Sequence, residues 1–389
     1  MPSYVGTKFL LYLFLVETCR GAFIGFKSWN DAVFPSFSLS SSVNAFEPES
    51  NFRSVTKIPV VEPLPPYSYS GQIERAIIRK FGAEPSRRVL DSWRLMDMGY
   101  EHREFISSAT THKDPAASFC YQHASSFVPG LRAKSFWDSN EFDWSTFLAK
   151  NYKTIRQEFL IVTEDMERLQ KQGNNVWAGA LSKEAGGYGE GWKTLVLMDR
   201  GIWDPTNCNL FPKTAKCVRD SGIPAVECFF ACMNPNTDIK MHSDFTNFVL
   251  TSHLAVEIPE NGKNKCRLTI GDDTREWING EVMIFDTSLL HNAVNEANGE
   301  RYILMFRLFH PDLTGVEKEA LQFIYDCLEL PQLLSDDPGE RYMAEQTVES
   351  MRTFPQLKTN SAGFGSIRKG GKKGKKKKKK GNIAAKGFG

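Results

Sequence analysis

Residues 242–258 read HSDFTNFVLTSHLAVEI, and this stretch predicts a strand with a pair of metal-ligand side chains at its start. From Asn247 onward the residues are mostly apolar and several are β-branched, which is typical of a buried strand. His242 and Asp244 precede this run, and side chains two residues apart at the end of a strand project to the same side. We therefore predict that an imidazole and a carboxylate meet at the edge of a sheet.

The stretch belongs to a series of short β-rich runs between residues 192 and 310. We expect strands at 192–198, 226–233, 247–258, 266–270, 281–286 and 301–309. Clusters of Asn, Asp, Gly and Pro separate these runs, as turns require. Many short strands at this spacing favour a sandwich, a jelly roll or a barrel. After the last strand, Thr314 and Glu317 form a capping box for a helix over 316–330.

A second histidine extends the ligand pair into a candidate metal site. His291 follows the apolar run 282–285, so that it could join His242 and Asp244 from a facing strand. Two imidazoles and one carboxylate on one face of an octahedron leave open coordination positions, an arrangement typical of non-haem Fe(II) oxygenases. A His-x-Asp pattern alone is weak evidence for a metal, and the second histidine and the strand context strengthen it.

Arg301 opens the last predicted strand and is followed by apolar residues. A guanidinium facing an apolar pocket needs a carboxylate, and the distal carboxylate of 2-oxoglutarate would supply a bidentate partner. An internal Asp or Glu is the alternative partner. His253 could hydrogen-bond the other carboxylate of this cosubstrate or support a metal ligand, and a half-buried structural histidine is the competing interpretation. His310 leads out of the strand and is expected to stabilise the turn.

The first 50 residues have the composition of a targeting sequence. Lys8 precedes the eight apolar residues 9–16, which are too few to span a bilayer but suit a secretory signal that ends in small residues by Ala22. Residues 23–45 are rich in Ser and Phe, with Asp31 as their only acidic residue, as in transit peptides. This combination resembles the bipartite plastid presequences of algae with secondary plastids. A plain signal peptide leading to the secretory pathway or the ER lumen is the alternative.

Between residues 70 and 175 the pattern is mostly helical. One series of apolar residues in alternating steps of four and three predicts a long helix packed on a sheet: Leu148, Tyr152, Ile155, Phe159, Val162, Met166 and Leu169. Residues 186–191 are Gly-rich but lack the Lys-Ser/Thr of a phosphate-binding loop, so we expect a flexible loop. Cys228 and Cys232 are expected to be small buried residues rather than a disulfide or a metal pair.

Charge is distributed unevenly along the 389 residues. Residues 361–389 contain eleven Lys or Arg and no Asp or Glu, whereas the rest has 37 basic and 46 acidic residues and a net charge of −9. This Gly- and Lys-rich tail cannot bury a core, and we expect it to be disordered. Its charge could give weak contact with an anionic membrane surface or with nucleic acid, and a solubilising tail is the alternative.

Several motifs follow one another between residues 242 and 313. They are His242-x-Asp244-x-Thr246-Asn247, His253-Leu254-Ala255-Val256-x-Ile258-Pro259, Trp277-x-x-Gly280-Glu281-Val282-x-Ile284-Phe285-Asp286, His291, and Arg301 through His310-Pro311-Asp312-Leu313. With residues 127–131, 136–137 and 212–214 upstream, they resemble the aspartyl/asparaginyl β-hydroxylase family of Fe(II)- and 2-oxoglutarate-dependent dioxygenases. Two positions depart from the animal enzymes that act on EGF-like domains, which have Gly in place of Asp244 and Arg in place of Thr251.

The resemblance implies a mainly β fold with flanking helices: a double-stranded β-helix core (jelly roll, cupin-like) and a helical N-terminal region. It implies Fe(II) held by His242, Asp244 and His291, with no catalytic residue beyond the metal centre. It also implies 2-oxoglutarate at Arg301 and His253, and O2 as the second cosubstrate. The expected order is a signal peptide (1–22), a transit-like or linker segment (23–50), a mainly helical region (51–175), the dioxygenase domain (176–315), C-terminal helices (316–360) and the disordered tail (361–389).

The expected activity is hydroxylation of a carbon of a protein, peptide or lipid-like substrate, with peptidyl Asp or Asn suggested by the family resemblance. Three alternatives stay open at this point. The chain could be a non-catalytic jelly-roll binding protein, a cupin-like metal enzyme that does not use 2-oxoglutarate, or an adaptor that acts through its basic tail. No transmembrane span is expected.

Overall fold

The computed structural model describes residues 57–107, 119–179 and 191–357. The predicted signal peptide, transit-like segment and Lys-rich tail, and nearly all of the Gly-rich loop, lie outside these residues. The helices are α2 (Tyr69–Phe81), α3 (Arg87–Asp97), η2 (Ser139–Glu141), α4 (Asp143–Thr163), α5 (Met166–Gln172), α6 (Pro205–Leu210), α7 (Pro212–Ser221), α8 (Gly315–Glu329), η4 (Pro331–Leu334) and α9 (Pro338–Arg352). The strands are β1 (His102–Ser107), β2 (Phe119–Ser126), β3 (Phe136–Trp137), β4 (Ala178–Gly179), β5 (Trp192–Asp199), β6 (Ile202–Trp203), β7 (Ala225–Met233), β8 (Thr237–His242), β9 (Phe245–Thr246), β10 (Val249–Glu257), β11 (Cys266–Ile270), β12 (Asp273–Glu276), β13 (Val282–Phe285), β14 (His291–Asn295) and β15 (Arg301–Phe309).

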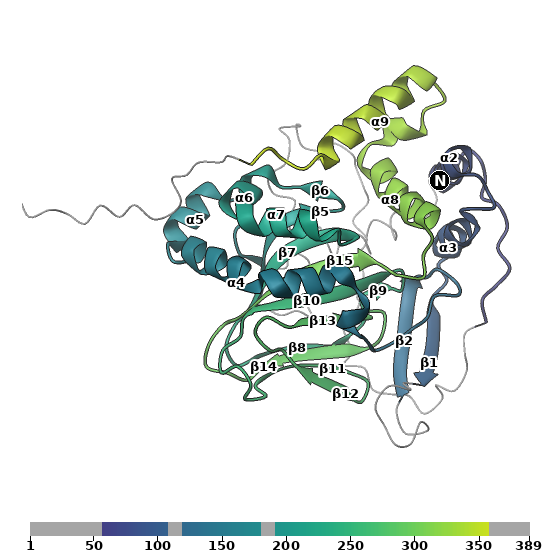
Figure 1. Ribbon diagram of the computed structural model, residues 1–389. Helices are drawn as coiled ribbons and strands as arrows, with labels where there is room; N and C mark the ends of the chain where they lie inside the picture. Colours follow the sequence, from purple (N-terminus) through teal and green to yellow (C-terminus); the bar gives the residue numbers. More distant parts are fainter. Residues whose placement is uncertain (1–56, 108–118, 180–190, 358–389) are drawn as a thin grey trace, which may run out of the picture. The chain divides into compact units, whose positions relative to one another are not determined.

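Two facing sheets form a jelly-roll core (Figure 1). The larger sheet has the strand order β3-β13-β10-β15-β7-β5-β4, and the smaller sheet has the order β12-β11-β14-β8. Between β7 and β15 the chain passes back and forth between the two sheets, and neighbouring strands pair antiparallel. This winding is that of a double-stranded β-helix. The mainly β fold class predicted from the sequence is therefore confirmed.

Apolar side chains fill the space between the two sheets. Ala255, Ile303 and Met305 of the larger sheet belong to one buried cluster with Leu268 and Ala293 of the smaller sheet. Burial of such side chains is the main favourable contribution to folding, at roughly 1.5–3 kcal/mol for each large aliphatic side chain. The inward face of the larger sheet therefore forms part of the core. Near the two ends of β15, the same face carries the polar side chains Arg301 and Arg307.

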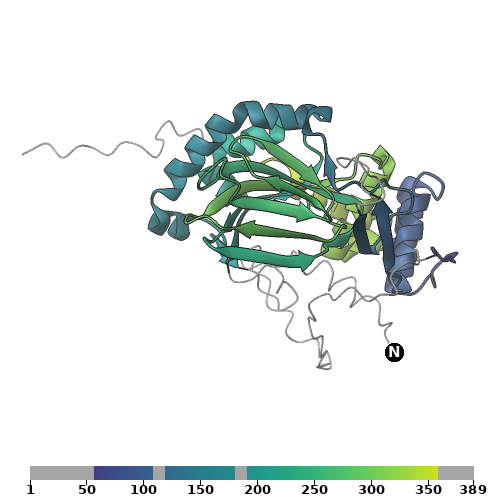
Figure 2. The ribbon, with the colours of Figure 1, turned by 90° about the horizontal axis from the view of Figure 1, so that it is seen from below.

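Helices α4 and α7 cover the outer face of the larger sheet (Figures 1 and 2). Phe230 of β7 contacts Phe159 of α4 and Phe211 at the start of α7, with ring centroids 4.9 Å apart in both pairs. The central strands are thus buried on both faces, which explains why their sequences are almost continuously apolar. The predicted packing of a helix on a sheet is confirmed.

A second buried cluster joins helices that precede the jelly roll to helices that follow it. Ile73 and Ile77 of α2 and Trp93 of α3 pack with Leu321 and Ile324 of α8. The N-terminal helices therefore do not form a layer of their own. They share one apolar core with the C-terminal helices, which also includes Val226, Val249 and Phe309 at the ends of β7, β10 and β15.

The mostly helical pattern expected for residues 70–175 is only partly correct. Strands β1 and β2 form an antiparallel hairpin there, and β2 also pairs with β9. Tyr121 and Ser125 of β2 are buried as well as Cys120, Gln122 and Ala124, so that both faces of this strand are largely covered. The predicted long helix is also interrupted, because α4 ends before Asp165. The side chain of Asp165 accepts a hydrogen bond from the backbone N–H of Arg168 and thereby caps the start of α5.

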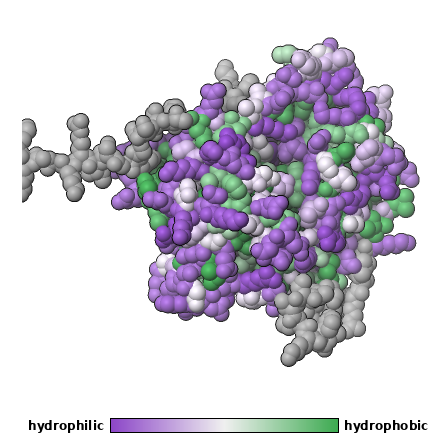
Figure 3. Space-filling model, viewed as in Figure 1, coloured by the Kyte–Doolittle hydropathy of each residue, from purple (hydrophilic) through white to green (hydrophobic). Residues whose placement is uncertain are grey.

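Other local predictions are confirmed. The strands expected at 266–270 and 301–309 match β11 and β15, and the helix expected at 316–330 matches α8 with its capping box. Cys228 and Cys232 are buried free thiols. Within the described ranges, none of the helices combines the length and the apolar composition that crossing a membrane requires. Hydrophilic residues predominate on the face shown in Figure 3.

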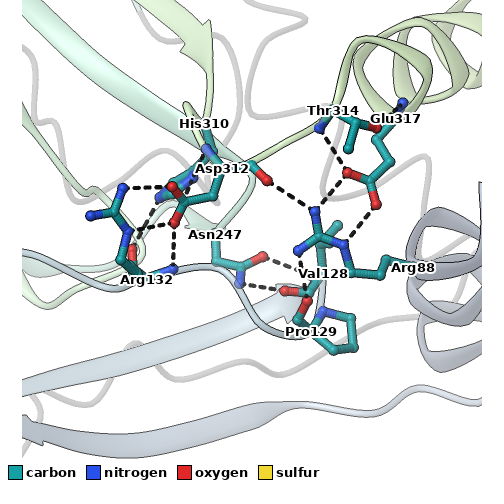
Figure 4. A network of polar contacts seen from close by, with 9 residues as sticks. All are labelled: Arg88, Val128, Pro129, Arg132, Asn247, His310, Asp312, Thr314 and Glu317. Carbon is teal, nitrogen blue, oxygen red and sulfur yellow. Dashed lines mark hydrogen bonds and ion pairs between the residues drawn. The ribbon is translucent and has the colours of Figure 1, made fainter.

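Polar contacts join segments that are distant in the sequence, both between the helices beside the jelly roll and between loops of the jelly roll (Figure 4). Arg88 of α3 donates to both carboxylate oxygens of Glu317 of α8, at 2.7 and 2.6 Å, across 229 positions of sequence. The buried side chain of Asn247 accepts a hydrogen bond from the backbone N–H of Val128 at 2.8 Å and donates to its carbonyl at 3.0 Å. Asn247 thereby fixes the segment after β2 to the segment that carries the ligand pair.

Replacing Asn247 tests this connection. Asn247→Ala should lower the free energy of unfolding by about 2–4 kcal/mol, since two buried backbone groups of Val128 would each lose a partner. Urea denaturation measures the change. Asn140→Ala is the matched control, because the exposed amide of Asn140 bonds Asp138 at the surface, and its effect should stay within about 0.5 kcal/mol. Equal losses in the two variants would contradict this role of Asn247.

Candidate functional site

The two predicted histidine ligands face each other across the smaller sheet. β8 ends at His242 and β14 begins at His291, and the two residues are direct partners in the antiparallel ladder. Their ring centroids are 4.3 Å apart. Strand pairing, rather than a loop, therefore sets the separation of the two imidazoles.

Asp244 lies just beyond the end of β8, where backbone contacts hold it. Its N–H donates to the carbonyl of Thr287 at 2.8 Å, and the neighbouring Ser243 hydroxyl donates to the carbonyl of His123 at 2.7 Å. One carboxylate oxygen of Asp244, Oδ1, is 3.6 Å from Nε2 of His242. Taken together with His291, each residue offers a ligand atom within 4.8 Å of the others. The structure thus brings the three predicted ligands together.

The hydrogen bonds of both imidazoles involve Nδ1, which leaves Nε2 available to bind a metal. Nδ1 of His242 lies 2.7 Å from the carbonyl oxygen of Lys240, and Nδ1 of His291 lies 2.8 Å from that of Leu289. A carbonyl only accepts, so each Nδ1 carries the proton and each Nε2 keeps a lone pair. Histidine ligands of metals generally donate their other N–H in this way. The donor set therefore fits a divalent transition metal.

The charges of Asp244 and His291 also suit a cation, whereas for His242 the effect of burial is outweighed by the contact with Asp244, which raises the pKa of His242. Burial alone would raise the pKa of Asp244, but Arg307 and His242 hold it well below its usual range, so that the carboxylate stays ionised. Burial, and then the proximity of His242, lower the pKa of His291 to about 4. A negative carboxylate and a neutral imidazole are the protonation states that bind a metal ion.

Arg301 is a buried cation whose guanidinium N–H groups have no hydrogen-bond acceptor among the described residues. It opens β15 as predicted, and its side chain is fully buried. Its guanidinium carbon lies 4.3 Å from the ring centroid of Trp277 and 5.5 Å from that of Trp192. Among the described residues, none accepts a hydrogen bond from any of its three guanidinium nitrogens. Burial lowers the pKa of Arg301 to about 10, so that it remains charged at neutral pH. The predicted alternative, an internal Asp or Glu partner, does not occur in this part of the chain.

His253 is a buried neutral donor near Arg301. Trp277 donates its indole N–H to Nδ1 of His253 at 3.2 Å, so that the proton of the neutral imidazole lies on Nε2. Within the described residues, this buried Nε2 has no hydrogen-bond partner. Burial, and then the charge of Arg301, hold the pKa of His253 well below its usual range. His253 is therefore buried rather than half-buried, and its Nε2–H has no acceptor among the described residues.

His310 has the structural role expected for it. Its Nδ1 accepts a hydrogen bond from the backbone N–H of Asp312 at 3.1 Å, and its Nε2 lies 3.0 Å from the carbonyl oxygen of Arg132. Both nitrogens therefore stabilise the turn after β15 and its contact with the segment after β2. His310 does not belong to the ligand cluster.

Arg307 also contacts the ligand cluster, which was not expected from the sequence. Its Nη1 donates to Oδ2 of Asp244 at 2.9 Å. Arg307 and Arg301 are six residues apart on β15, an even spacing that places both on the inward face of the strand. This parity is visible in the sequence, but an arginine in an apolar strand does not by itself reveal that its partner is a ligand carried by another sheet.

Comparison with known proteins identifies relatives of this chain. Residues 149–311 match the family model described as aspartyl/asparaginyl beta-hydroxylase. The human aspartyl/asparaginyl beta-hydroxylase is 28% identical over 221 residues, which cover 55% of this chain and 27% of that protein. The human aspartate beta-hydroxylase domain-containing protein 2 is 29% identical over 209 residues, which cover 51% of this chain and 53% of that protein. The family resemblance carried by the motifs is thereby confirmed.

The matches cover only part of these relatives, between about a quarter and just over half of their lengths. Among solved structures, a Pseudomonas putida prolyl-4-hydroxylase aligns with 42% of this chain and 98% of its own, at 14% identity and a TM-score of 0.29. The strand pairing described above establishes the jelly-roll fold.

Because Arg301 is buried without a hydrogen-bond partner among the described residues, its replacement is expected to stabilise the protein. Arg301→Met should raise the free energy of unfolding of the metal-free protein by about 1–2 kcal/mol, because a buried charge without a partner is replaced by an apolar side chain of similar length. Denaturation in urea would measure this. Arg88→Met is the comparison and should destabilise, since Arg88 is bonded to Glu317. A loss at Arg301 as large as that at Arg88 would show that Arg301 has a structural partner.

Proposed function

We propose that this chain, whose residues 149–311 belong to the aspartyl/asparaginyl β-hydroxylase family, is an Fe(II)- and 2-oxoglutarate-dependent dioxygenase that hydroxylates a carbon of its substrate. The observation that carries the proposal is the unpaired buried guanidinium of Arg301 in the same barrel as three convergent metal ligands. A metal site alone would suit many enzymes. A metal site with a buried carboxylate receptor suits one that uses a 2-oxoacid.

The proposed roles follow from the contacts of each residue. His242, Asp244 and His291 would hold Fe(II) through Nε2, Oδ1 and Nε2. Arg301 would bind the distal carboxylate of 2-oxoglutarate through its free N–H groups, with Trp277 and Trp192 excluding water around it. A carboxylate in this position would satisfy the charge whose burial is otherwise unfavourable.

His253 would orient the cosubstrate by donating its Nε2 proton to a cosubstrate oxygen. Trp277 fixes the tautomer needed for this, because its indole N–H already engages Nδ1. When bound, iron would supply the chemistry, coupling the oxidative decarboxylation of 2-oxoglutarate by O2 to the insertion of oxygen into a substrate C–H bond.

The substrate class is a separate part of the proposal. One human relative is named for aspartyl and asparaginyl hydroxylation and the other for aspartate hydroxylation, so we propose a peptidyl Asp or Asn as the acceptor. Peptides containing Asp or Asn, scored by mass spectrometry for the gain of one oxygen atom, test this class against lipid acyl chains. Turnover on acyl chains alone would contradict the peptide assignment and leave the reaction type intact.

An anaerobic titration of the full chain with Fe(II) and then 2-oxoglutarate tests the cofactors. Wild-type protein should develop the visible charge-transfer band of Fe(II) chelated by a 2-oxoacid. Asp244→Ala should abolish the band, since one of three ligands is lost. Arg301→Met should still bind Fe(II) but should need about 10–100-fold more 2-oxoglutarate, the loss expected for a charge-assisted pair of hydrogen bonds.

The matched control for both variants is Arg156→Met. Arg156 of α4 pairs with Glu257 at 2.6 Å on the outer side of the larger sheet, so that its removal deletes an ion pair away from the barrel. Its titration should equal that of the wild type. A folded wild-type protein that binds iron but shows no band with 2-oxoglutarate would contradict the proposed cosubstrate.

A further inference from the structure

Asp244 uses its two carboxylate oxygens differently. Oδ2 accepts a hydrogen bond from Nη1 of Arg307 at 2.9 Å, whereas Oδ1 is the oxygen near the imidazole of His242. The side chains of Asp244 and Arg307 are 7% and 14% exposed, so that water screens this ion pair little. Charge-assisted bonds of this kind are about twice as strong as neutral hydrogen bonds. The two oxygens are therefore not interchangeable.

Arg307 is itself held firmly. β15 is hydrogen-bonded on both sides, and Arg307 is paired with Thr251 of β10 and with Glu227 of β7. Its Nε lies 3.9 Å from Oε2 of the buried Glu227. The guanidinium thus lies between two carboxylates, one at the metal site and one behind it.

A further ion pair continues this series away from the barrel. Arg200 contacts Asp199 at 3.0 Å and Glu329 of α8 at 2.6 Å, and the charge of Arg200 also acts on Glu227. Basic and acidic side chains therefore alternate from Asp244 toward α8, and burial raises the pKa of Glu227 within this series to about 7. Such a series fixes the guanidinium of Arg307 more firmly than a single surface ion pair could.

We infer that Arg307 is a positioning residue that makes Asp244 a one-oxygen metal ligand. A carboxylate can bind a metal through one oxygen or through both. Binding through both would use a coordination position that the cosubstrate or O2 needs. With Oδ2 engaged by Arg307, only Oδ1 is directed to the metal. This inference rests on the metal site of the proposed function and adds a residue that does not touch the metal.

Fe(II) affinity, measured anaerobically on the full chain, tests the inference. Arg307→Met should weaken Fe(II) binding by about 10–100-fold, the effect typical of removing a residue that orients a ligand. Arg307→Lys should recover part of this loss, because one N–H donor can still reach Oδ2. The surface control Arg156→Met should bind Fe(II) within about twofold of wild type, since it keeps the Arg307–Asp244 contact.

A spectroscopic signature separates positioning from mere folding. In the Arg307→Met variant saturated with Fe(II) and 2-oxoglutarate, the charge-transfer band should shift in wavelength, because the carboxylate ligand changes its binding mode. A general loss of stability would lower the amount of folded protein but would not move the band. If Arg307→Met does not fold, the double variant Arg307→Met/Glu227→Gln removes both charges of the buried pair, and it should show the same weakening and the same shift.

The outcomes distinguish this inference from the proposed function. Wild-type protein that binds no Fe(II) would overturn the proposed metal centre. Wild-type protein that binds Fe(II), with loss of binding in Asp244→Ala but unchanged or tighter binding and an unmoved band in the Arg307 variants, would overturn only the role of Arg307. Tighter binding would show that Arg307 competes with the metal for Asp244.

Discussion

The position of β15 between β10 and β7 is the constraint on which the rest of the structure depends. Its outward side chains pack under the helices, and its inward side chains Ile303 and Met305 form part of the core between the sheets. Because side chains alternate along a strand, the same register that buries these two residues also directs Arg301 and Arg307 inward. A shift of one residue would exchange the core residues and the arginines with the opposite face. The core therefore fixes the two functional cations.

The buried charges inside the barrel are unfavourable to folding. Arg301 is buried without a hydrogen-bond partner among the described residues, and Asp244, Arg307 and Glu227 bring further charges out of water. Each uncompensated buried charge costs several kcal/mol. The apolar cluster between the sheets and the separate cluster of α2, α3 and α8 supply the stability that such a site requires. Rigid strands on both sides also keep the ligands in place when no metal offsets their burial.

The sequence predicted well whatever depends on local pattern. Strands with continuous apolar residues and the capping box at Thr314 follow from nearby residues, and the cluster formed by His242, Asp244 and His291 was also expected from the sequence. The sequence failed where partners are distant. The hairpin of β1 and β2 was missed because its residues are only partly apolar, and because β2 also pairs with the distant β9. The sharing of one core by α2, α3 and α8 was equally invisible, since no local period records which helix lies against which.

The contact between Asp244 and Arg307 shows why some site residues escape sequence reasoning. Removing either partner alone would take from the other its closest ion-pair contact in a buried site, which is expected to destabilise the protein. The pair therefore behaves as a unit, although 63 positions separate its members. Thr251 of β10 lies opposite Arg307 in the ladder, so that the strand pairing places an uncharged side chain beside the arginine. The charge arrangement around Asp244 is therefore a property of the folded pairings rather than of neighbouring positions in the sequence.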